Sequence, residues 1–173
     1  MSQLFSTSRA EAVVFRFPAL FFPVLAALAL ALQATLPVVV HVAVYMDLPL
    51  LVVVYWAITV RQPTGASCAG AALGLLQDSL AHLALGVNGI AKTLIGWLGA
   101  TLGAGLDADH AGIRWLAVFG CYELNRAVLY LFERFLLGTP VPWRGVATVV
   151  AAGANAVLAV LLFPGFDRFR RWV

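Results

Sequence analysis

Six long apolar runs, separated by short segments that carry most of the charge, constrain this 173-residue chain more than any other feature. Hydrophobic residues make up 62% of the sequence and charged residues only 11%, well below the charged share of an ordinary soluble domain. A soluble fold of this size needs a polar surface, which so few charges do not supply. The composition therefore excludes a soluble domain, a disordered chain, a nucleic-acid-binding module and a large catalytic domain outside a membrane.

The apolar runs predict an all-α membrane protein in which six transmembrane helices form one bundle. A bilayer core takes about 20 helical residues, and six such spans account for the apolar excess. We expect Pro37 to end the first span and the pair Pro164 and Gly165 to end the sixth, and the fifth has an alternative end near Leu137. No linker divides the chain, so residues 1–173 are expected to form a single integral membrane domain. The expected spans are about 18–36, 48–60, 64–80, 89–106, 112–131 and 145–163.

The positions of the arginines predict the orientation of these spans. Cytoplasmic segments of membrane proteins carry an excess of Lys and Arg. With a cytoplasmic N-terminus, seven arginines fall in inside segments and only Arg134 and Arg144 fall outside. This count favours six spans with both termini in the cytoplasm. The inside arginines are Arg9, Arg16, Arg61, Arg114, Arg168, Arg170 and Arg171.

The second apolar run is too short for a regular span. At 1.5 Å per residue it covers only about 20 Å, and extending it back to Val38 places Asp47 and Pro49 inside the helix. We therefore predict that Asp47 to Pro49 interrupts a helix or begins a short one at the outer side. Irregular backbone at membrane depth must be satisfied by protein or by a water-lined cavity, so the preceding stretch VVVHVAVY is expected to have its backbone held against protein.

Small residues recur at helical spacing in the third and fourth spans. Such faces let two helix backbones approach closely in lipid. Two interpretations remain open: packing within the chain, and docking of a partner's helix. The glycines concerned are Gly70, Gly74, Gly96, Gly99 and Gly103. Cys68 and Cys121 also lie in apolar runs and are expected to be small buried residues rather than metal or disulfide cysteines.

Two charges in the fifth span need a physical reason, because a charge within a span costs roughly 2.5–3.5 kcal/mol on insertion scales. Glu123 and Arg126 are three positions apart and therefore share a helix face, with Asn125 between them. The plainer hypothesis is a structural ion pair that faces the bundle. The alternative is a polar pocket or a contact for a partner.

A second group of polar residues lies at the outer ends of the third and fourth spans. Asp78 and Lys92 are predicted to meet and to fix the hairpin, with His82 and Asn88 in the connection and Asp47 as a possible third member. The group has no nucleophile with a base at a defined spacing and no metal-binding pair such as HExxH. We therefore expect no catalytic residue, no metal and no cofactor, and interpret the residues as partner or pocket candidates.

Two stretches together carry a family resemblance. One is DLPLLVVVYWAI at 47–58, a short apolar run led by Asp and Pro. The other is GAALGLLQDSLAHLALGVNGIAKTLIGWLGA at 70–100, a glycine-spaced helix ending in Asp, then LG-x-N and a Lys-led helix. This pattern resembles MreD, the family of bacterial rod-shape-determining membrane proteins. Outside these stretches the match rests on length, hydropathy and the Arg-rich tail.

The resemblance implies a function and a set of partners. It implies a non-enzymatic membrane scaffold in the cell-elongation machinery of the bacterial cytoplasmic membrane, which regulates lateral peptidoglycan synthesis. The expected partner is an MreC-type protein with a single span and a large periplasmic part, beside MreB, RodA and a class B penicillin-binding protein. The family fold is similar to the S-components of energy-coupling-factor vitamin transporters. Asp78, Gly86, Asn88 and Lys92 fall in the family's periplasmic-side loop pattern.

Two other functions stay open at this point. The first is an S-component-like, substrate-binding subunit of a vitamin transporter, for which Tyr45, Trp56 and Trp97 are candidate pocket aromatics. A small-molecule pocket is expected to combine such aromatics with a few converging polar groups. The second is a small membrane enzyme, which the missing catalytic constellation disfavours.

Overall fold

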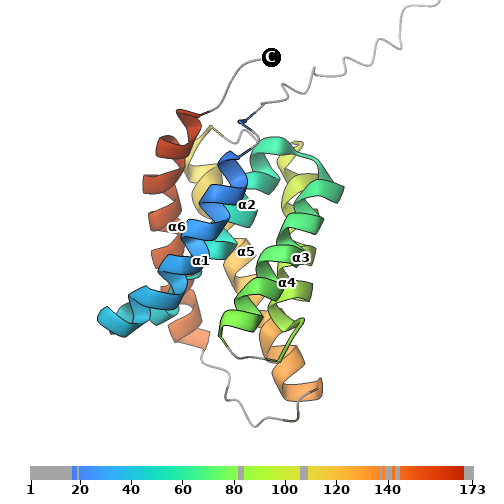
Figure 1. Ribbon diagram of the computed structural model, residues 1–173, viewed down its shortest axis with the longest axis vertical. Coiled ribbons are helices and arrows are strands. Elements are labelled where there is room, and N and C mark those ends of the chain that lie inside the picture. Colours follow the sequence, from blue (N-terminus) through green and yellow to red (C-terminus); the bar gives the residue numbers. More distant parts are fainter. Residues whose placement is uncertain are drawn as a thin grey trace, which may run out of the picture.

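The computed structural model describes residues 17–18, 20–81, 84–105, 109–136, 138, 142 and 145–169. These residues form an all-helical bundle with six α-helices and no strand, which confirms the predicted all-α class. Figure 1 shows the helices running up and down the long axis of the molecule. The elements are α1 (Phe21–Val39), η1 (His41–Tyr45), α2 (Leu48–Val60), α3 (Pro63–Leu80), α4 (Val87–Gly103), α5 (Ala111–Leu131), η2 (Phe132–Leu136) and α6 (Gly145–Asp167).

The bundle has two ends, which we name by a residue at each. At the Asp47 end, α1, α3 and α5 finish and α2, α4 and α6 begin; the Arg114 end is the opposite one. The start of α1 and the end of α6 meet at the Arg114 end, where the Phe21 ring lies 5.2 Å from the Phe169 ring. An even number of helices therefore brings the two ends of the described helical chain to the same side.

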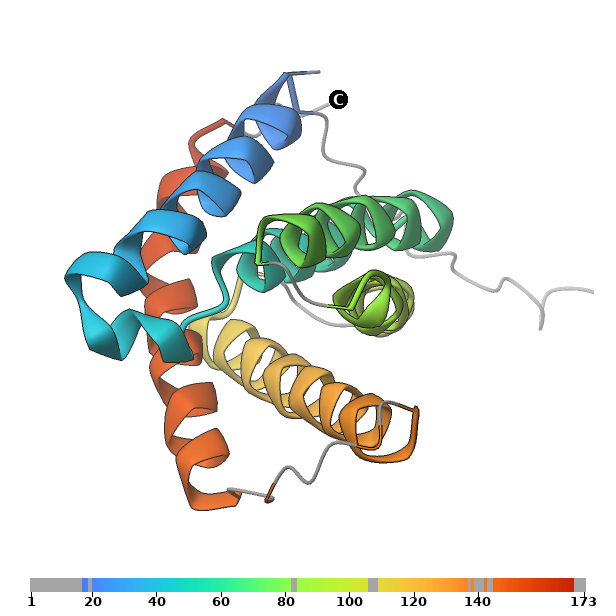
Figure 2. The same cartoon turned by 60° about the horizontal axis from the view of Figure 1, so that its bottom comes forward.

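The short helix α2 lies at the centre of the bundle, and the other helices surround it (Figure 2). All its residues from Pro49 to Thr59 are buried except Trp56, which is half-buried. A helix that is apolar on every side can be enclosed by protein on every side, and α2 is enclosed in this way. The 13-residue run that is too short for a regular span is therefore the core of the bundle.

The proline positions expected to end α1 and α6 lie inside these helices. Pro37 lies in the last turn of α1, which continues to Val39, and Pro164 is followed by three further residues of α6. The predicted ends are therefore wrong in both cases. A proline removes one helical hydrogen bond, whereas leaving the helix in an apolar environment exposes several unpaired backbone groups. The fifth helix extends as a π-helix to Leu136, close to the alternative end.

Two helices satisfy the length and composition expected for a membrane span. These are α1 and α6, and most of the apolar span of α1 is not covered by the chain itself. The remaining described helices are shorter or less apolar.

The glycines of α3 and α4 serve packing within the chain. A methyl group at Gly70 would overlap the backbone carbonyl of Lys92, and one at Gly74 would overlap that of Asn88. Gly96 meets the backbone of Ala66 in the same way. Gly99 and Gly103 lie against α2, 3.0 Å from the Ala57 Cβ and 2.9 Å from the Ile58 Cα respectively, measured from the position of an added Cβ. The structure thus favours the intramolecular interpretation of the small-residue faces.

The two cysteines differ in their surroundings. Cys121 is half-buried, whereas Cys68 is exposed on the outer face of α3 and is therefore not the buried residue expected from its apolar neighbours. The apolar pattern does not tell these environments apart, because an apolar residue in a membrane helix faces either protein or lipid.

Candidate functional site

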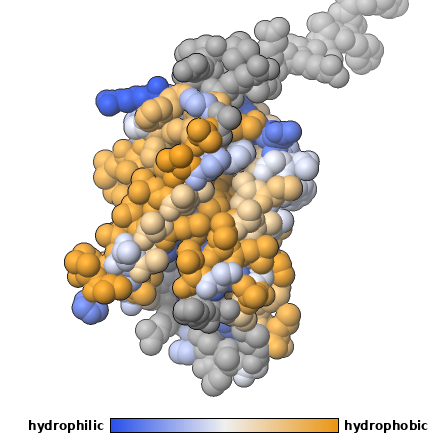
Figure 3. Space-filling model, viewed as in Figure 1, coloured by the Kyte–Doolittle hydropathy of each residue, from blue (hydrophilic) through white to orange (hydrophobic). Residues whose placement is uncertain are grey.

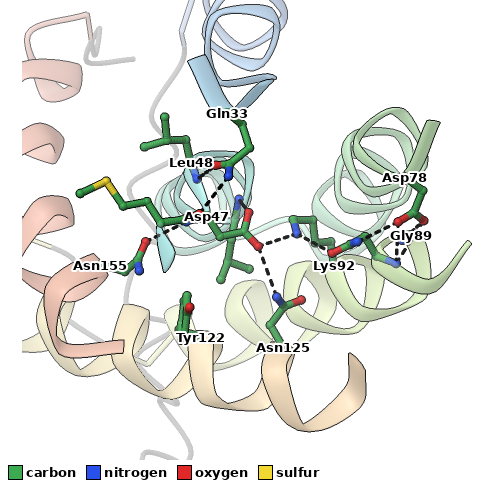
Figure 4. Close-up of polar contacts among 12 residues, drawn as sticks. Gln33, Asp47, Leu48, Asp78, Gly89, Lys92, Tyr122, Asn125 and Asn155 are labelled. Carbon is green, nitrogen blue, oxygen red and sulfur yellow. Dashed lines mark hydrogen bonds and ion pairs between the residues drawn. The ribbon is translucent and has the colours of Figure 1, made fainter. Parts of the chain in front are cut away.

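The carboxylate of Asp47 is the centre of a buried polar network (Figure 4). Asp47 immediately precedes α2 and caps it by accepting a 3.0 Å hydrogen bond from the backbone N–H of Leu50. Its Oδ2 atom forms an ion pair with Lys92 Nζ of α4 at 2.9 Å and accepts a 3.3 Å hydrogen bond from Asn125 Nδ2 of α5. One carboxylate thus joins three helices.

Asp78, a residue of α3, caps the start of the neighbouring helix α4. It lies at the end of α3 and is fully buried, where it accepts hydrogen bonds from the backbone N–H groups of Gly86, Asn88 and Gly89 at 2.9, 3.1 and 3.4 Å. These donors are the unpaired N–H groups of the first turn of α4. The helix dipole also favours a negative charge at this point, so Asp78 fixes the start of α4.

Asn88 joins the two carboxylates. Its Nδ2 donates to Asp78 Oδ1 at 2.7 Å, and its Oδ1 accepts a 3.3 Å hydrogen bond from Lys92 Nζ. The prediction that Asp78 and Lys92 form a direct pair is therefore wrong, because Lys92 pairs with Asp47 and reaches Asp78 only through Asn88. Asp78 is already occupied by backbone donors and by the Asn88 amide, whereas Asp47 has Oδ2 available for the ammonium.

The irregular backbone between η1 and α2 is held by side chains from three other helices. Asn155 of α6 accepts from the Asp47 N–H at 3.0 Å and donates to the Tyr45 carbonyl at 2.9 Å, which also accepts from the Tyr122 hydroxyl at 2.9 Å. Gln33 of α1 donates to the Met46 carbonyl. Protein thus holds the backbone of Tyr45, Met46 and Asp47, where the predicted interruption occurs. The expectation that the whole preceding stretch VVVHVAVY is held against protein is wrong, because Ala43 is the one buried residue among 38–45.

Sequence reasoning did not select the amides that complete this network. Gln33 and Asn155 are isolated amides within long apolar runs, and Asn125 lies between the two charges of the fifth span. A lone polar side chain within a membrane helix is costly and usually has a partner. That signal was present in the sequence, but it does not say which backbone group each amide meets.

A polar cavity of about 190 Å³ lies beside the network. Residues of α1, α3, α4, α5 and η2 line it together with the segments before α2 and α4, and its charged members are Asp47, Arg126 and Glu133. Gln77 and Asn125 also line it, and each has a buried side-chain oxygen without a hydrogen-bond partner. The remaining lining residues are Gln33, Val44, Met46, Ala84, Val87, Asn88, Tyr122 and Leu129.

The predicted ion pair between Glu123 and Arg126 is wrong. Neither residue takes part in any of the three ion pairs found among the described residues, and Glu123 Oε1 is buried without a partner. Arg126 is exposed and lines the polar cavity. A long side chain keeps its charged head near water when it can, and the cavity gives Arg126 that environment. His82, the last of the predicted site residues, lies outside the described residues.

A second polar cluster ties the helices together at the Arg114 end. Arg114 at the start of α5 is buried and pairs with Asp167 at the end of α6 at 2.7 Å and with Asp109 at 3.2 Å. The Tyr55 hydroxyl of α2 donates to Asp167 at 3.0 Å. This cluster fixes the end of the bundle at which α2 and α6 finish.

The polar groups around Asp47 hold the helices in position, and most of them are already occupied by hydrogen bonds to other parts of the chain. Asp47 and Asp78 accept helix N–H groups, and Lys92 is held between Asp47 and Asn88. Among the described residues no group of three or more His, Cys, Asp or Glu side chains is arranged to hold a metal ion. The arrangement therefore positions the start of α2 and of α4 against α5 and α6.

Comparison with known proteins gives one match that covers nearly the whole chain. A family model described as "rod shape-determining protein MreD" matches residues 13–171. No curated protein and no solved structure matches.

Proposed function

The chain belongs to the family of the rod shape-determining protein MreD, and from this membership we propose that it is a non-enzymatic scaffold of the bacterial cell-elongation complex. In this proposal it lies in the cytoplasmic membrane, binds an MreC-type partner and thereby regulates lateral peptidoglycan synthesis. MreB, RodA and a class B penicillin-binding protein complete the larger complex. The family match over residues 13–171 is the observation that carries the proposal.

The state of the buried polar groups supports a scaffold rather than an enzyme. A general acid or base must reach a proton of the substrate, but Asp47 and Asp78 are occupied by helix N–H groups, Lys92 and Asn88. The network instead fixes how the six α-helices meet. A protein that acts through contacts needs such a defined surface, and a rigid bundle provides one.

We propose six membrane spans with both termini in the cytoplasm, so that the Asp47 end faces outward. The described part of the chain supports this topology, because Arg61, Arg114 and Arg168 all lie at or near the Arg114 end, where α1 begins. The positive-inside rule assigns that end to the cytoplasm. A reporter fused after Val173 that is active in the periplasm would contradict the topology.

The function is tested by complementation in a rod-shaped bacterium whose own family member has been depleted. Expression of this protein together with its MreC-type partner is expected to restore rod shape, and the tagged protein is expected to co-purify with that partner. Spherical cells despite normal levels of both proteins, together with no co-purification, would refute the scaffold proposal.

The polar cavity is the feature that a second candidate, an S-component-like subunit of a vitamin transporter, would use. Its volume of about 190 Å³ is below the roughly 300–1,000 Å³ usual for small-molecule pockets. None of the candidate aromatics Tyr45, Trp56 and Trp97 lines it. The scaffold is therefore preferred, and mass spectrometry of ligand extracted from the purified protein decides: a stoichiometric vitamin-sized molecule would reverse the preference.

A further inference from the structure

A groove between α1 and α3 leads from the Arg114 end of the bundle to the polar cavity at the Asp47 end. Its apolar part has a volume of about 650 Å³ and lies between α1 and α3 over α2. Leu30 lines both this part and a hollow of about 260 Å³, and Gln33 and Gln77 line both the hollow and the polar cavity. Figure 3 faces α1 and α3 and shows that apolar side chains cover most of the surface there.

The apolar part and the hollow follow one face of each helix, so they form one groove. On α1 the lining residues recur every three or four positions from Pro23 to Ala34, and on α3 they do so from Gly65 to Leu80. Residues at this spacing share a helix face. From Gly65 to Gln77 the groove is about 18 Å long at 1.5 Å per residue, close to half of the roughly 30 Å hydrocarbon core of a bilayer. Its length therefore suits the hydrocarbon chain of a lipid in one leaflet.

Polar and apolar side chains are separated along this feature. Among the described residues, no charged and no amide side chain lines the apolar part of the groove. The polar cavity at its other end is lined by Asp47, Arg126 and Glu133 together with several amides. A phospholipid has the same distribution, with a charged headgroup at one end and hydrocarbon along the rest of its length.

Arg126 gives the polar cavity the chemistry of an anion site. Its side chain is exposed and, within the described part of the chain, forms no ion pair and no hydrogen bond. The neighbouring cation Lys92 is already held by Asp47 and Asn88. An arginine within a membrane span pairs with another group or faces a polar cavity, and a guanidinium binds phosphate through two parallel hydrogen bonds. The cavity therefore offers an uncommitted guanidinium to a phosphate group.

We infer that the polar cavity and the α1–α3 groove together bind one phospholipid from the leaflet that the Asp47 end faces. The phosphodiester of its headgroup lies in the cavity against Arg126, and the glycerol passes between Gln33 and Gln77. One acyl chain follows the groove over α2 toward the Arg114 end. This inference goes beyond the scaffold function, because it concerns a ligand of the bundle, and either one can fail without the other.

The test is photolabelling of the full-length protein in detergent micelles by a small molar excess of a phospholipid with a diazirine near the end of one acyl chain. Adducts are mapped by mass spectrometry and are expected on the groove residues between Gly65 and Leu76. Arg126→Gln is expected to lower these adducts at least about tenfold, equivalent to about 1.4 kcal/mol. Arg134→Gln, a change at an exposed arginine of η2 outside the cavity, is the matched control and should leave them within about twofold. The reacting carbon is at the far end of the lipid from Arg126, so only a bound headgroup couples the two positions.

Competitors show which part of the lipid is recognised. Diacylglycerol has the chains without the phosphate, and glycerol 3-phosphate has the phosphate without the chains. Each is expected to displace the probe at least about tenfold more weakly than an unlabelled phospholipid. Equal displacement by diacylglycerol would show that the cavity takes no part, and equal displacement by glycerol 3-phosphate would make it a site for free phosphate esters; either result overturns the inference.

Bulky variants give a second measurement, the phospholipid retained by the protein in native mass spectrometry. Ala72→Trp fills the groove, and Ala154→Trp places the same side chain on an exposed face of α6. Ala72→Trp is expected to reduce the retained phospholipid at least about tenfold, while Ala154→Trp leaves it within about twofold. All variants are compared as monodisperse protein in gel filtration, so that loss of lipid is not loss of the fold.

Two further outcomes would overturn the inference. One is equal labelling of the groove in the wild type and in Arg126→Gln, because the headgroup would then have no contact in the cavity. The other is a wild-type protein whose groove takes no adducts while the exposed face of α6 around Leu161 does, because protein, such as a second copy of this chain, would then cover the groove. Restoration of rod shape and co-purification of the partner report on the proposed function separately.

Discussion

The ion pair between Asp47 and Lys92 permits the sharpest prediction about stability. The two residues are 45 positions apart and join α2 to α4, with Lys92 fully buried and Asp47 only 8% exposed. Removing one partner of a buried pair leaves an uncompensated charge and costs roughly 3–5 kcal/mol. We expect Lys92→Met and Asp47→Asn each to lower the free energy of unfolding by about this amount.

The double variant should be much less damaging than the sum of the single changes. Asparagine is as good an N-cap as aspartate, so Asn at position 47 keeps the acceptor for Leu50, and Met fills the volume of the Lys92 stem. Asn125, which donates to Asp47 Oδ2, can turn its amide so that its partnerless Oδ1 accepts from the new Asn side chain. What remains lost is the bond from Lys92 to the Asn88 side chain, a cost of about 1–3 kcal/mol for a buried acceptor without a partner. The coupling energy between the two changes is expected to exceed about 2 kcal/mol.

The assay is reversible unfolding of the purified protein in mixed micelles, with each variant compared with the wild type. Arg168→Gln is the control, because Arg168 is exposed near the end of α6 and a surface change of this kind stays within about 0.5 kcal/mol. If the double variant loses as much stability as the two single variants together, the network does not act as a paired unit and the reasoning is refuted.

Three further predictions use the same assay. Gly74→Ala should destabilise the protein by several kcal/mol, because the added methyl group meets the Asn88 backbone. Gly153→Ala is the control: its methyl group meets nothing within 4 Å, and it should stabilise the protein by up to about 1 kcal/mol through helix propensity. Equal effects of the two changes would contradict the packing of α3 on α4. Asp78→Ala should cost more than about 2 kcal/mol, because it leaves several N–H groups of α4 unpaired; a loss below about 0.5 kcal/mol would refute the capping role. Glu123→Gln and Arg126→Gln should be additive within about 0.5 kcal/mol, because the two side chains form no ion pair; a larger coupling would restore the paired interpretation.

Local pattern determined the class of structure and the position of its main irregularity. Long apolar runs must become helices in an apolar environment, because only a helix satisfies its own backbone groups. An Asp followed by Pro at the second position marks a helix start, and α2 begins after Asp47 as expected. The sequence also identified four of the residues that form the buried network, because polar groups within apolar runs are costly enough to require partners.

The partners themselves were decided only by the tertiary structure. Sequence proximity favoured Asp78 for Lys92, yet the ammonium meets Asp47, because backbone donors at the start of α4 already occupy Asp78. Likewise, three positions on one helix suggested a pair of Glu123 with Arg126, but Arg126 lines the polar cavity instead. These choices depend on how each helix is rotated against its neighbours and on which groups are already satisfied. A local pattern fixes the cost of burying a polar group, whereas the packing of distant helices fixes which partner offsets that cost.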